Sequence, residues 1–210
     1  MSNSLRWASR ALMLGVSLIT ATAVGAQTNV AATANNPLAQ GYASDGGYPG
    51  ATLNGPLDGN SNGQWNPPTF WHSINNSFDW WYVDLAQQWS VSSMTFYNRI
   101  DCCAYRIDNG LFQLWTSTPF AIGSTAVFTS SLNSTTVQAF SVPNVVARYA
   151  SVQAGNCGHG DCVLNFPEVE VMAVAVTPTP EPASTALLAT GLLGVAAAVR
   201  RTRKKAQPIV

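Results

Sequence analysis

Cationic side chains are almost absent from the middle of this chain. From Gln27 to Pro182 the sequence contains no lysine, and its three arginines are Arg99, Arg106 and Arg148. The same stretch carries ten acidic residues, which leaves a formal charge of about −7. A protein that holds nucleic acid needs several cations to neutralise the phosphates. This composition therefore excludes nucleic acid as a partner.

The sequence also lacks sustained helical periodicity between residues 37 and 176. Apolar residues do not recur there at the spacing of an amphipathic helix, and short β-rich runs alternate with Gly, Pro, Asn and Ser. In the last run, Val169, Val171 and Ala173 share one face, which is expected to be buried. Strands are expected at 80–85, 90–99, 111–117, 124–129, 136–142, 148–154 and 163–175. Many short strands predict an all-β fold, an antiparallel sandwich or barrel.

The first 26 residues have the pattern of a secretory signal. Arg6 and Arg10 precede an apolar run at 11–19 and a small-residue stretch at 20–26. This pattern predicts a signal peptide, residues 1–26, that is cleaved after Ala26. The alternative is a retained membrane anchor.

The C-terminal segment has three consecutive parts. Pro180, Glu181 and Pro182 precede an apolar run of seventeen residues at 183–199. A basic cluster follows, consisting of Arg200, Arg201, Arg203, Lys204 and Lys205. The apolar run is at the lower length limit for a single transmembrane helix, and the cations predict a cytoplasmic C-terminus. The alternative, a buried core helix, fits poorly with five cations directly after the run.

This tripartite arrangement resembles the PEP-CTERM sorting signal of Gram-negative bacteria. We assign the signal to residues 177–205, of which 177–182 form a Pro/Thr-rich linker. The resemblance implies recognition by an exosortase, a transient membrane anchor and removal of the tail. It also implies delivery to the cell surface or its exopolysaccharide.

Composition suggests the remaining boundaries. Residues 27–36 are rich in Ala, Thr and Asn and are predicted to be a flexible leader. Residues 37–176, about 140 residues, suffice for one core. Among the tryptophans, Trp80, Trp81 and Trp89 are expected to pack the core and its ends. Trp65 and Trp71 fall in a polar loop and are better candidates than the other three for facing the solvent and binding a ligand.

Two of the three arginines between Gln27 and Pro182 belong to one sequence motif. The pattern reads His72, twenty-six residues, Arg99, one residue, Asp101, four residues and Arg106, with Cys102 and Cys103 inside the last gap. Each guanidinium offers a fork of donors that suits bidentate recognition of oxygen-rich ligands. The constellation is therefore a candidate binding site.

This spacing resembles the fucose-binding motif of the F-type lectins, the eel fucolectin and tachylectin-4 group. Further agreement lies at residues 57–60, 80–85, 98–103, 148–149 and 168–171. The resemblance covers residues 37–176. It implies a discoidin-like β-sandwich, or jelly roll, that recognises L-fucose or a fucose-like sugar.

The resemblance also implies a role for each residue of the motif. Arg99 and Arg106 would donate charge-assisted hydrogen bonds to sugar hydroxyls and the ring oxygen, and His72 would contact the axial hydroxyl. Asp101 would pair with the arginines and hold their rotamers. Trp65, seven residues before His72, is at the position of an aromatic side chain that holds the fucose methyl group.

The four cysteines are expected to form two local disulfides. In an oxidising compartment Cys102 and Cys103 can close a vicinal ring against which a sugar face packs. Free thiols or separate long-range bridges are the alternatives. Cys157 and Cys162 bracket a loop with His159, a pattern compatible with zinc, but a local disulfide is favoured in an exported protein.

A structural calcium ion is implied by the same resemblance. Family members bind it mainly through backbone carbonyls, with side chains from an Asp-x-Asn loop and a late Glu. Asp58, Asn60 and Glu168 match these positions, and Thr69 keeps a hydroxyl where Ser is usual. Oxygen ligands of this kind suit Ca²⁺. The alternative is a plain Asp-Gly-Asn turn.

The chain departs from several animal members of the family at one bridge. Phe70 and Pro167 occupy the positions of the cysteines that join the His72 loop to the last strand. An apolar contact is expected to replace that disulfide.

Two functions compete at this point. The first is an exported lectin for a fucosylated glycan or exopolysaccharide. The second is a non-catalytic matrix protein that uses the same sandwich without a free-fucose site. The presence of His72, Arg99 and Arg106 together favours the lectin. No nucleophile elbow or paired general-acid carboxylates stand out, so no enzymatic activity is expected.

Overall fold

Two long antiparallel strands, β4 (Trp80–Tyr97) and β7 (Val137–Gln153), form the centre of the sheet. The computed structural model describes residues 26–74, 78–155, 163–176, 188–196 and 200–201. The other members of the seven-stranded sheet are β1 (Thr28–Asn29), β2 (Gln40–Ala43), β5 (Leu111–Trp115), β6 (Ala126–Ser131) and β9 (Glu168–Ala175).

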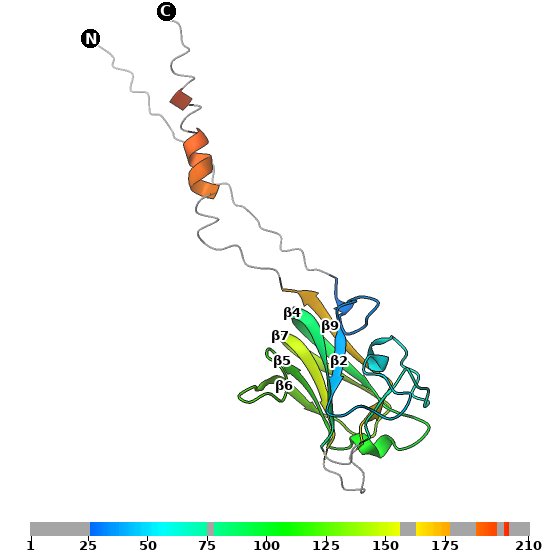
Figure 1. Ribbon diagram of the computed structural model, residues 1–210. Helices are drawn as coiled ribbons and strands as arrows, with labels where there is room; N and C mark the ends of the chain where they lie inside the picture. The colour runs from blue at the N-terminus through cyan, green and yellow to red at the C-terminus, as the bar shows by residue number, and fades with distance from the viewer. Residues whose placement is uncertain (1–25, 75–77, 156–162, 177–187, 197–199, 202–210) are drawn as a thin grey trace, which may run out of the picture.

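The strand order confirms the all-β, antiparallel fold class. The sheet runs β1-β9-β4-β7-β5-β6, and β2 pairs with the first part of β4 (Figure 1). Within the described residues every paired strand is antiparallel to its neighbour. A second ladder joins β3 (Trp71–His72) to β8 (Asn165–Phe166), and two short 3-10 helices, η1 (Gly55–Leu57) and η2 (Ala104–Ile107), lie in the loops.

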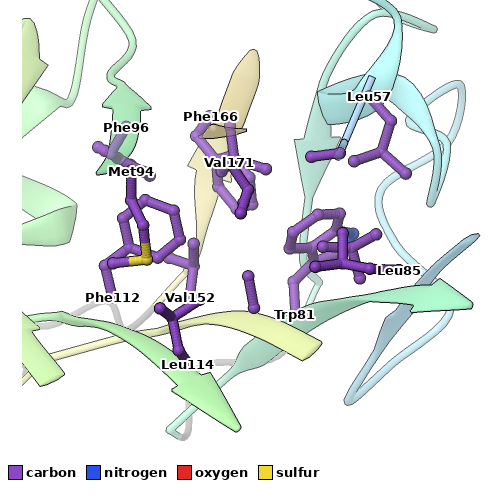
Figure 2. Packing of buried hydrophobic residues seen from close by; sticks show 14 of the residues in the cluster. Leu57, Trp81, Leu85, Met94, Phe96, Phe112, Leu114, Val152, Phe166 and Val171 are labelled. Carbon is purple, nitrogen blue, oxygen red and sulfur yellow. The ribbon is translucent and has the colours of Figure 1, made fainter. Parts of the chain in front are cut away.

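Alternation along the strands places the core on one face of the sheet. In β4, Trp81, Val83 and Leu85 are fully buried, whereas the residues between them are only partly buried. Figure 2 shows aromatic and aliphatic side chains from several strands meeting on this face. The Phe166 ring packs 5.4 Å from both the Trp81 ring and the Phe96 ring, measured between centroids. This packing attaches the β8 segment to the sheet, because buried apolar area is the main stabilising term.

The predicted strands are present, but four of them merge into two, and the segment 163–175 is divided at Pro167 into β8 and β9. Segments 80–85 and 90–99 belong to β4, and segments 136–142 and 148–154 belong to β7. The expectation of loops between them was wrong because the pairing shifts register there without ending. Ala86 takes a positive φ of 67°, and its N–H is held by the Asp84 carboxylate at 2.8 Å. A bulge of this kind bends a strand and leaves the ladder continuous on both sides.

The prediction that residues 27–36 are a flexible leader is wrong. Thr28 and Asn29 pair with β9, and the Val30 N–H donates to the carbonyl of Val171 at 2.9 Å. Val30 and Ala31 belong to the core, with 1% and 0% of their surface exposed. Composition misled here because small and polar residues also serve at the edge of a sheet.

The tryptophans differ from the prediction in two cases. Trp80 is only partly buried and stacks on Tyr82 and Phe120 outside the core cluster. Trp81 is fully buried and Trp89 packs against the core, as expected. Trp71 was expected in an open loop but lies in β3 with only 1% of its surface exposed. With only two residues, this strand is too short to show an alternating pattern in the sequence.

The C-terminal segment is described only in part. Residues 188–196 are helical, within the apolar run at 183–199. Among the described residues, no helix is both long and apolar enough to cross a membrane. The signal peptide, the 177–182 linker and the Pro180-Glu181-Pro182 motif lie outside the described residues, as do Cys157 and Cys162 with the loop between them.

Candidate functional site

The β3–β8 ladder fixes His72 in place. Its strand partner is Asn165, and the neighbouring loop is attached by the Tyr48 N–H, which donates to the His72 carbonyl at 2.6 Å. Gly47 makes this approach possible. Its φ is +74°, and an added Cβ would lie 2.6 Å from the Trp71 ring. The ladder joins the His72 loop to the segment before β9. In several animal members of the family a disulfide makes this connection, but Phe70 and Pro167 occupy its positions here.

Arg99 follows the end of β4 and is held by Asp101. The Nε and Nη2 groups of Arg99 donate to the two carboxylate oxygens of Asp101 at 2.6 and 3.0 Å. The hydrogen bonds from Arg99 are the largest cause of the lowered pKa of Asp101. Only 11% of the Arg99 side chain is exposed. The predicted pairing with Arg99 is therefore present, and it restricts the guanidinium to one orientation.

The loop that carries Arg106 is closed by local hydrogen bonds. The Asn98 side chain donates to the Ala104 carbonyl at 3.0 Å, and the Arg106 N–H in η2 donates to the Cys103 carbonyl at 3.1 Å. Cys102 and Cys103 are bonded to each other, as predicted. The vicinal ring thus lies beside the backbone of Arg106.

Charge interactions show that the two arginines converge on His72. The pKa of His72 is lowered below its usual 6.5, first by burial and then by the positive charges of Arg106 and Arg99. The Ser73 carbonyl, which accepts from the ring, opposes this shift, as does Asp45. His72 is therefore neutral at pH 7. Arg99 lies over the Trp65 ring that contacts His72, and Arg106, 34 positions after His72 in the sequence, is near enough for its charge to act on the same imidazole.

The hydrogen bond to Ser73 assigns the tautomer of the neutral ring. His72 Nδ1 lies 2.7 Å from the Ser73 carbonyl oxygen, which can only accept. Nδ1 therefore carries the proton, and Nε2 presents a lone pair. The site combines one acceptor with two forked cationic donors, an arrangement suited to a ligand rich in hydroxyl groups.

An aromatic wall flanks these polar groups. The Trp65 ring lies 5.2 Å from the His72 ring and 5.5 Å from the Phe70 ring, and the Arg99 guanidinium stacks over it at 5.0 Å. Tyr48, which is 49% exposed, completes the wall with its ring 5.1 Å from that of His72. The sequence analysis identified Trp65 but missed Tyr48. The only feature of the sequence that pointed to Tyr48 is an aromatic residue within a Gly- and Pro-rich loop.

Close backbone packing brings Trp65 to Arg99. The Ile100 N–H donates to the Gly63 carbonyl at 2.8 Å. A Cβ on Gly63 would lie 2.6 Å from the Asn98 carbonyl oxygen, so this approach requires glycine. The loop before His72 and the loop after β4 are thereby held side by side.

One of the predicted calcium residues, Glu168, is a buried carboxyl group that contacts the loop carrying Asp58 and Asn60. Glu168, at the start of β9, is 1% exposed, and its Oε2 accepts the Gly59 N–H at 3.2 Å. Burial, the Asp58 charge and the Glu170 charge raise the pKa of Glu168 to about 9, against the Gly59 hydrogen bond. Its Oε1 is buried without a hydrogen-bond partner in the described part of the chain.

This arrangement fits a hard cation. A buried carboxylate oxygen without a donor, beside a second carboxylate, is stabilised by a positive ion. No group of three or more His, Cys, Asp or Glu side chains in the described ranges is placed to hold a metal. A cation here would therefore also need backbone carbonyls and Asn60. The Thr69 hydroxyl donates to the Asn66 carbonyl at 2.7 Å, which leaves its oxygen lone pairs as acceptors.

Family models match two parts of the chain. The model described as a NedA-like, galactose-binding domain matches residues 57–152, and the PEP-CTERM protein-sorting motif matches residues 178–204. Fucolectin-1 of Anguilla japonica is 39% identical over 61 residues, which are 28% of this chain and 34% of that protein. The chain thus spans about a third of the length of the curated relatives it matches.

Solved structures of similar fold cover most of the described domain. A fucose binding module of Streptococcus pneumoniae has a TM-score of 0.57 and 26% identity, with 70% of this chain and 96% of that one covered. A fucolectin from striped bass, Morone saxatilis, has a TM-score of 0.58 and 25% identity, over 71% of this chain and 50% of that one.

Proposed function

We propose that this chain, which carries a discoidin-like domain of the F5/F8 type C family and a PEP-CTERM sorting motif, is an exported lectin for L-fucose or a fucose-like sugar. The binding site would be formed by His72, Arg99 and Arg106. The observation that carries the proposal is the convergence of these three side chains beside an aromatic wall. The names of the relatives and of the similar structures, fucolectins and a fucose binding module, support it.

The chemistry of the site matches that of a deoxy sugar. Fucose presents adjacent hydroxyls, a ring oxygen and a methyl group. A hydroxyl can donate to Nε2 of His72 while its oxygen accepts from an arginine fork, so one hydroxyl satisfies both kinds of group. The methyl group and the apolar ring face would pack against Trp65 and the Cys102–Cys103 ring.

The site is arranged before the ligand arrives. Asp101 holds Arg99 through two hydrogen bonds, and Trp65 covers one face of the guanidinium. Groups held in the bound geometry lose little conformational entropy on binding. Asp101 and Trp65 would therefore contribute to affinity partly through Arg99.

A calcium ion at Asp58, Asn60 and Glu168 is part of the proposal. These residues would hold the ion together with backbone carbonyls, and Thr69 would add a hydroxyl oxygen. The ion would supply positive charge to the buried Glu168 carboxylate and would stabilise the contact between the Asp58 loop and β9. It would not contact the sugar, because its residues are distinct from those of the sugar site.

A glycan array with the purified protein tests the function most directly. Binding to fucosylated glycans would support the lectin, and no binding to any glycan would favour the matrix protein. We expect a dissociation constant of about 10 µM to 1 mM for free L-fucose, because a monosaccharide offers few atoms.

Substitution of the arginines tests the site itself. Arg99→Ala and Arg106→Ala should each weaken fucose binding by about 2 kcal/mol, because a charge-assisted hydrogen bond is lost. Arg148→Ala is the matched control. Arg148 is bonded to Asp84 at 2.9 Å, on the outer face of the sheet. Calorimetry that finds wild-type affinity in Arg106→Ala, or an equal loss in Arg148→Ala, would contradict the assignment.

A further inference from the structure

Ser73, the residue after His72, is held by hydrogen bonds in three directions. Its N–H donates to the Leu164 carbonyl at 3.0 Å, and its hydroxyl accepts the Leu164 N–H at 3.0 Å. The same hydroxyl donates to Oδ2 of Asp79 at 2.5 Å. Ser73 is fully buried. The carbonyl that accepts from His72 belongs to the next peptide unit, whose Ile74 N–H donates to the Asp45 carboxylate at 2.8 Å. Bonds on both sides of the Ser73 Cα therefore restrict the orientation of this carbonyl.

Asp79 anchors this arrangement from the other side. It has no exposed surface, and its Oδ1 accepts the Ser44 hydroxyl at 3.2 Å. Its backbone carbonyl accepts the Ala154 N–H at 2.8 Å. The Ser44 hydroxyl in turn accepts the Trp80 N–H at 3.2 Å. A buried carboxylate needs such donors, so the network resists rearrangement.

These contacts form a continuous chain from Asp79 to the ring of His72. Asp79 anchors the Ser73 hydroxyl, the Ile74 N–H bond to Asp45 holds the adjoining peptide unit, and the Ser73 carbonyl of that unit accepts the Nδ1 proton of His72. Among the residues of this hydrogen-bond network, only His72 belongs to the proposed sugar site. We propose that Asp79 and Ser73 are positioning residues that keep His72 in the Nδ1–H tautomer, with Nε2 free to accept from a sugar hydroxyl.

The inference deepens the proposed function and rests on it in one respect, the use of Nε2 as an acceptor. If the Ser73 carbonyl turns away, the ring gains the alternative tautomer, in which Nε2 carries the proton. Nε2 would then be a donor beside the donors of Arg99 and Arg106. A sugar hydroxyl that bonds to both kinds of group would lose its acceptor.

The tautomer of His72 is the first measurement. Long-range ¹H–¹⁵N spectra of the imidazole rings, recorded above pH 6.5 where the neutral ring dominates, distinguish Nδ1–H from Nε2–H. The chain has two histidines, so the His72 signals are those missing from His72→Gln. We expect the wild-type protein to show Nδ1–H, and Ser73→Ala and Asp79→Asn to show a share of the Nε2–H form.

Sugar affinity is the second measurement. Calorimetry with L-fucose should show a loss of about five- to tenfold in both variants, the equivalent of one neutral hydrogen bond. Asp79→Asn keeps the shape of the side chain but gives Ser44 and Ser73 only one acceptor oxygen. If Ser73→Ala does not fold, Asp79→Asn alone decides the question.

Ser151→Ala controls for general loosening of the fold. Ser151 is also fully buried, and its hydroxyl accepts the Trp115 Nε1–H at 2.9 Å on the other side of the sheet. We expect this variant to lose stability while the His72 spectrum and the sugar affinity stay unchanged. A folded Asp79→Asn protein with the wild-type tautomer would overturn the proposal, and so would equal spectral changes in Ser151→Ala.

The two proposals fail in different ways. If wild-type protein binds no fucose but the His72 tautomer still responds to Ser73→Ala or Asp79→Asn, the proposed function is wrong and the positioning role stands. If fucose binds to the wild type and to Asp79→Asn with equal affinity and equal tautomer, only the positioning role is wrong.

Discussion

At the scale of single residues, the fold shifts the pKa values of two side chains that belong to the proposed sites. His72 is held neutral by burial and by the charges of Arg106 and Arg99. Glu168 is held protonated by burial, with a pKa of about 9. Each proposed role needs the deprotonated group, neutral imidazole at His72 and carboxylate at Glu168, so binding at both sites should weaken as the pH falls.

Sugar binding should weaken on acidification. The lowered pKa keeps His72 neutral at pH 7, and protonation as the pH falls through this value below 6.5 removes the Nε2 acceptor. Calorimetric titration with L-fucose across this range measures the effect. His72→Gln keeps an acceptor without titrating, so its affinity should be nearly independent of pH. The same acid decline in this variant would assign the effect to another group.

The lowered pKa of His72 also determines how the stability of the fold changes with pH. The folded protein binds a proton at His72 less tightly than the unfolded chain does. Stability from this residue is therefore present above 6.5 and is lost as the pH falls through the lower folded value.

Calcium binding should release a proton from Glu168. With a pKa of about 9, the metal-free carboxyl is protonated at pH 7 and must ionise to act as a ligand. Calorimetry in buffers of different ionisation enthalpy should give about one proton per ion, and affinity should rise with pH towards 9. Glu170→Gln, a change in the partly buried neighbour, should leave this release intact. Proton release that persists in Glu168→Gln would refute the assignment.

Without calcium, Glu168 should also make stability depend on pH. A pKa raised from 4.5 to about 9 contributes stability that is fully present below 4.5 and is lost as the pH rises through 9. Bound calcium should remove this dependence, because it favours the ionised form.

At the scale of elements, the N-terminal segment belongs to the folded domain. β1 covers the edge of β9, and Val30 enters the core directly after it. An unpaired sheet edge is prone to pairing with other chains, so β1 also protects β9. The mature protein should therefore need the residues that directly follow the predicted cleavage after Ala26.

Truncation of one core side chain tests this claim. Val30→Ala should lower the free energy of unfolding by about 2 kcal/mol, because Val30 is 1% exposed and its removal leaves a cavity. Val127→Ala is the control, since Val127 in β6 is 43% exposed and should change stability by only about 0.5 kcal/mol. Denaturant unfolding measures both. If both variants change the free energy of unfolding by the same small amount, residues 27–36 act as a flexible leader.

At the scale of the whole molecule, the candidate sugar site and the C-terminal end of β9 lie at opposite ends of the sheet. Tyr97, at the end of β4 that precedes Arg99, pairs with Glu168 at the start of β9, whereas Ala175 pairs with Trp89 at the far end (Figure 1). β9 ends at Ala175, and the matched sorting motif begins in the sequence at residue 178. A site turned away from the attachment point suits a protein that is held at one end while it binds a glycan at the other.

The sorting motif predicts proteolytic maturation. An exosortase should cut near Pro180-Glu181-Pro182, so protein recovered outside the cell should lack the basic residues that follow position 199. Mass spectrometry of surface material measures the C-terminus, and a strain without exosortase should keep the uncut form in its membrane. Surface protein that still carries residues 200–210 would replace sorting with simple membrane anchoring.

Much of the fold class and part of the site could be predicted because they depend on local patterns. Alternation along single strands indicated an all-β protein, and the spacing of His72, Arg99, Asp101 and Arg106 indicated the constellation. The Cys102–Cys103 bond followed from adjacency. The errors concern contacts between distant segments: β1 with β9, the burial of Trp71, and the bulge at Ala86 that keeps β4 continuous.

The sequence by itself determined which chemical groups the site contains. Cations are rare between Gln27 and Pro182, and two of the three arginines in this region belong to one motif. Only the tertiary structure decided how those groups are held. Tyr48 reaches His72 through the β3 contact, and Asp79 reaches it through Ser73. Such contacts depend on which backbones pack together, and the burial that neutralises His72 and protonates Glu168 exists only in the folded chain.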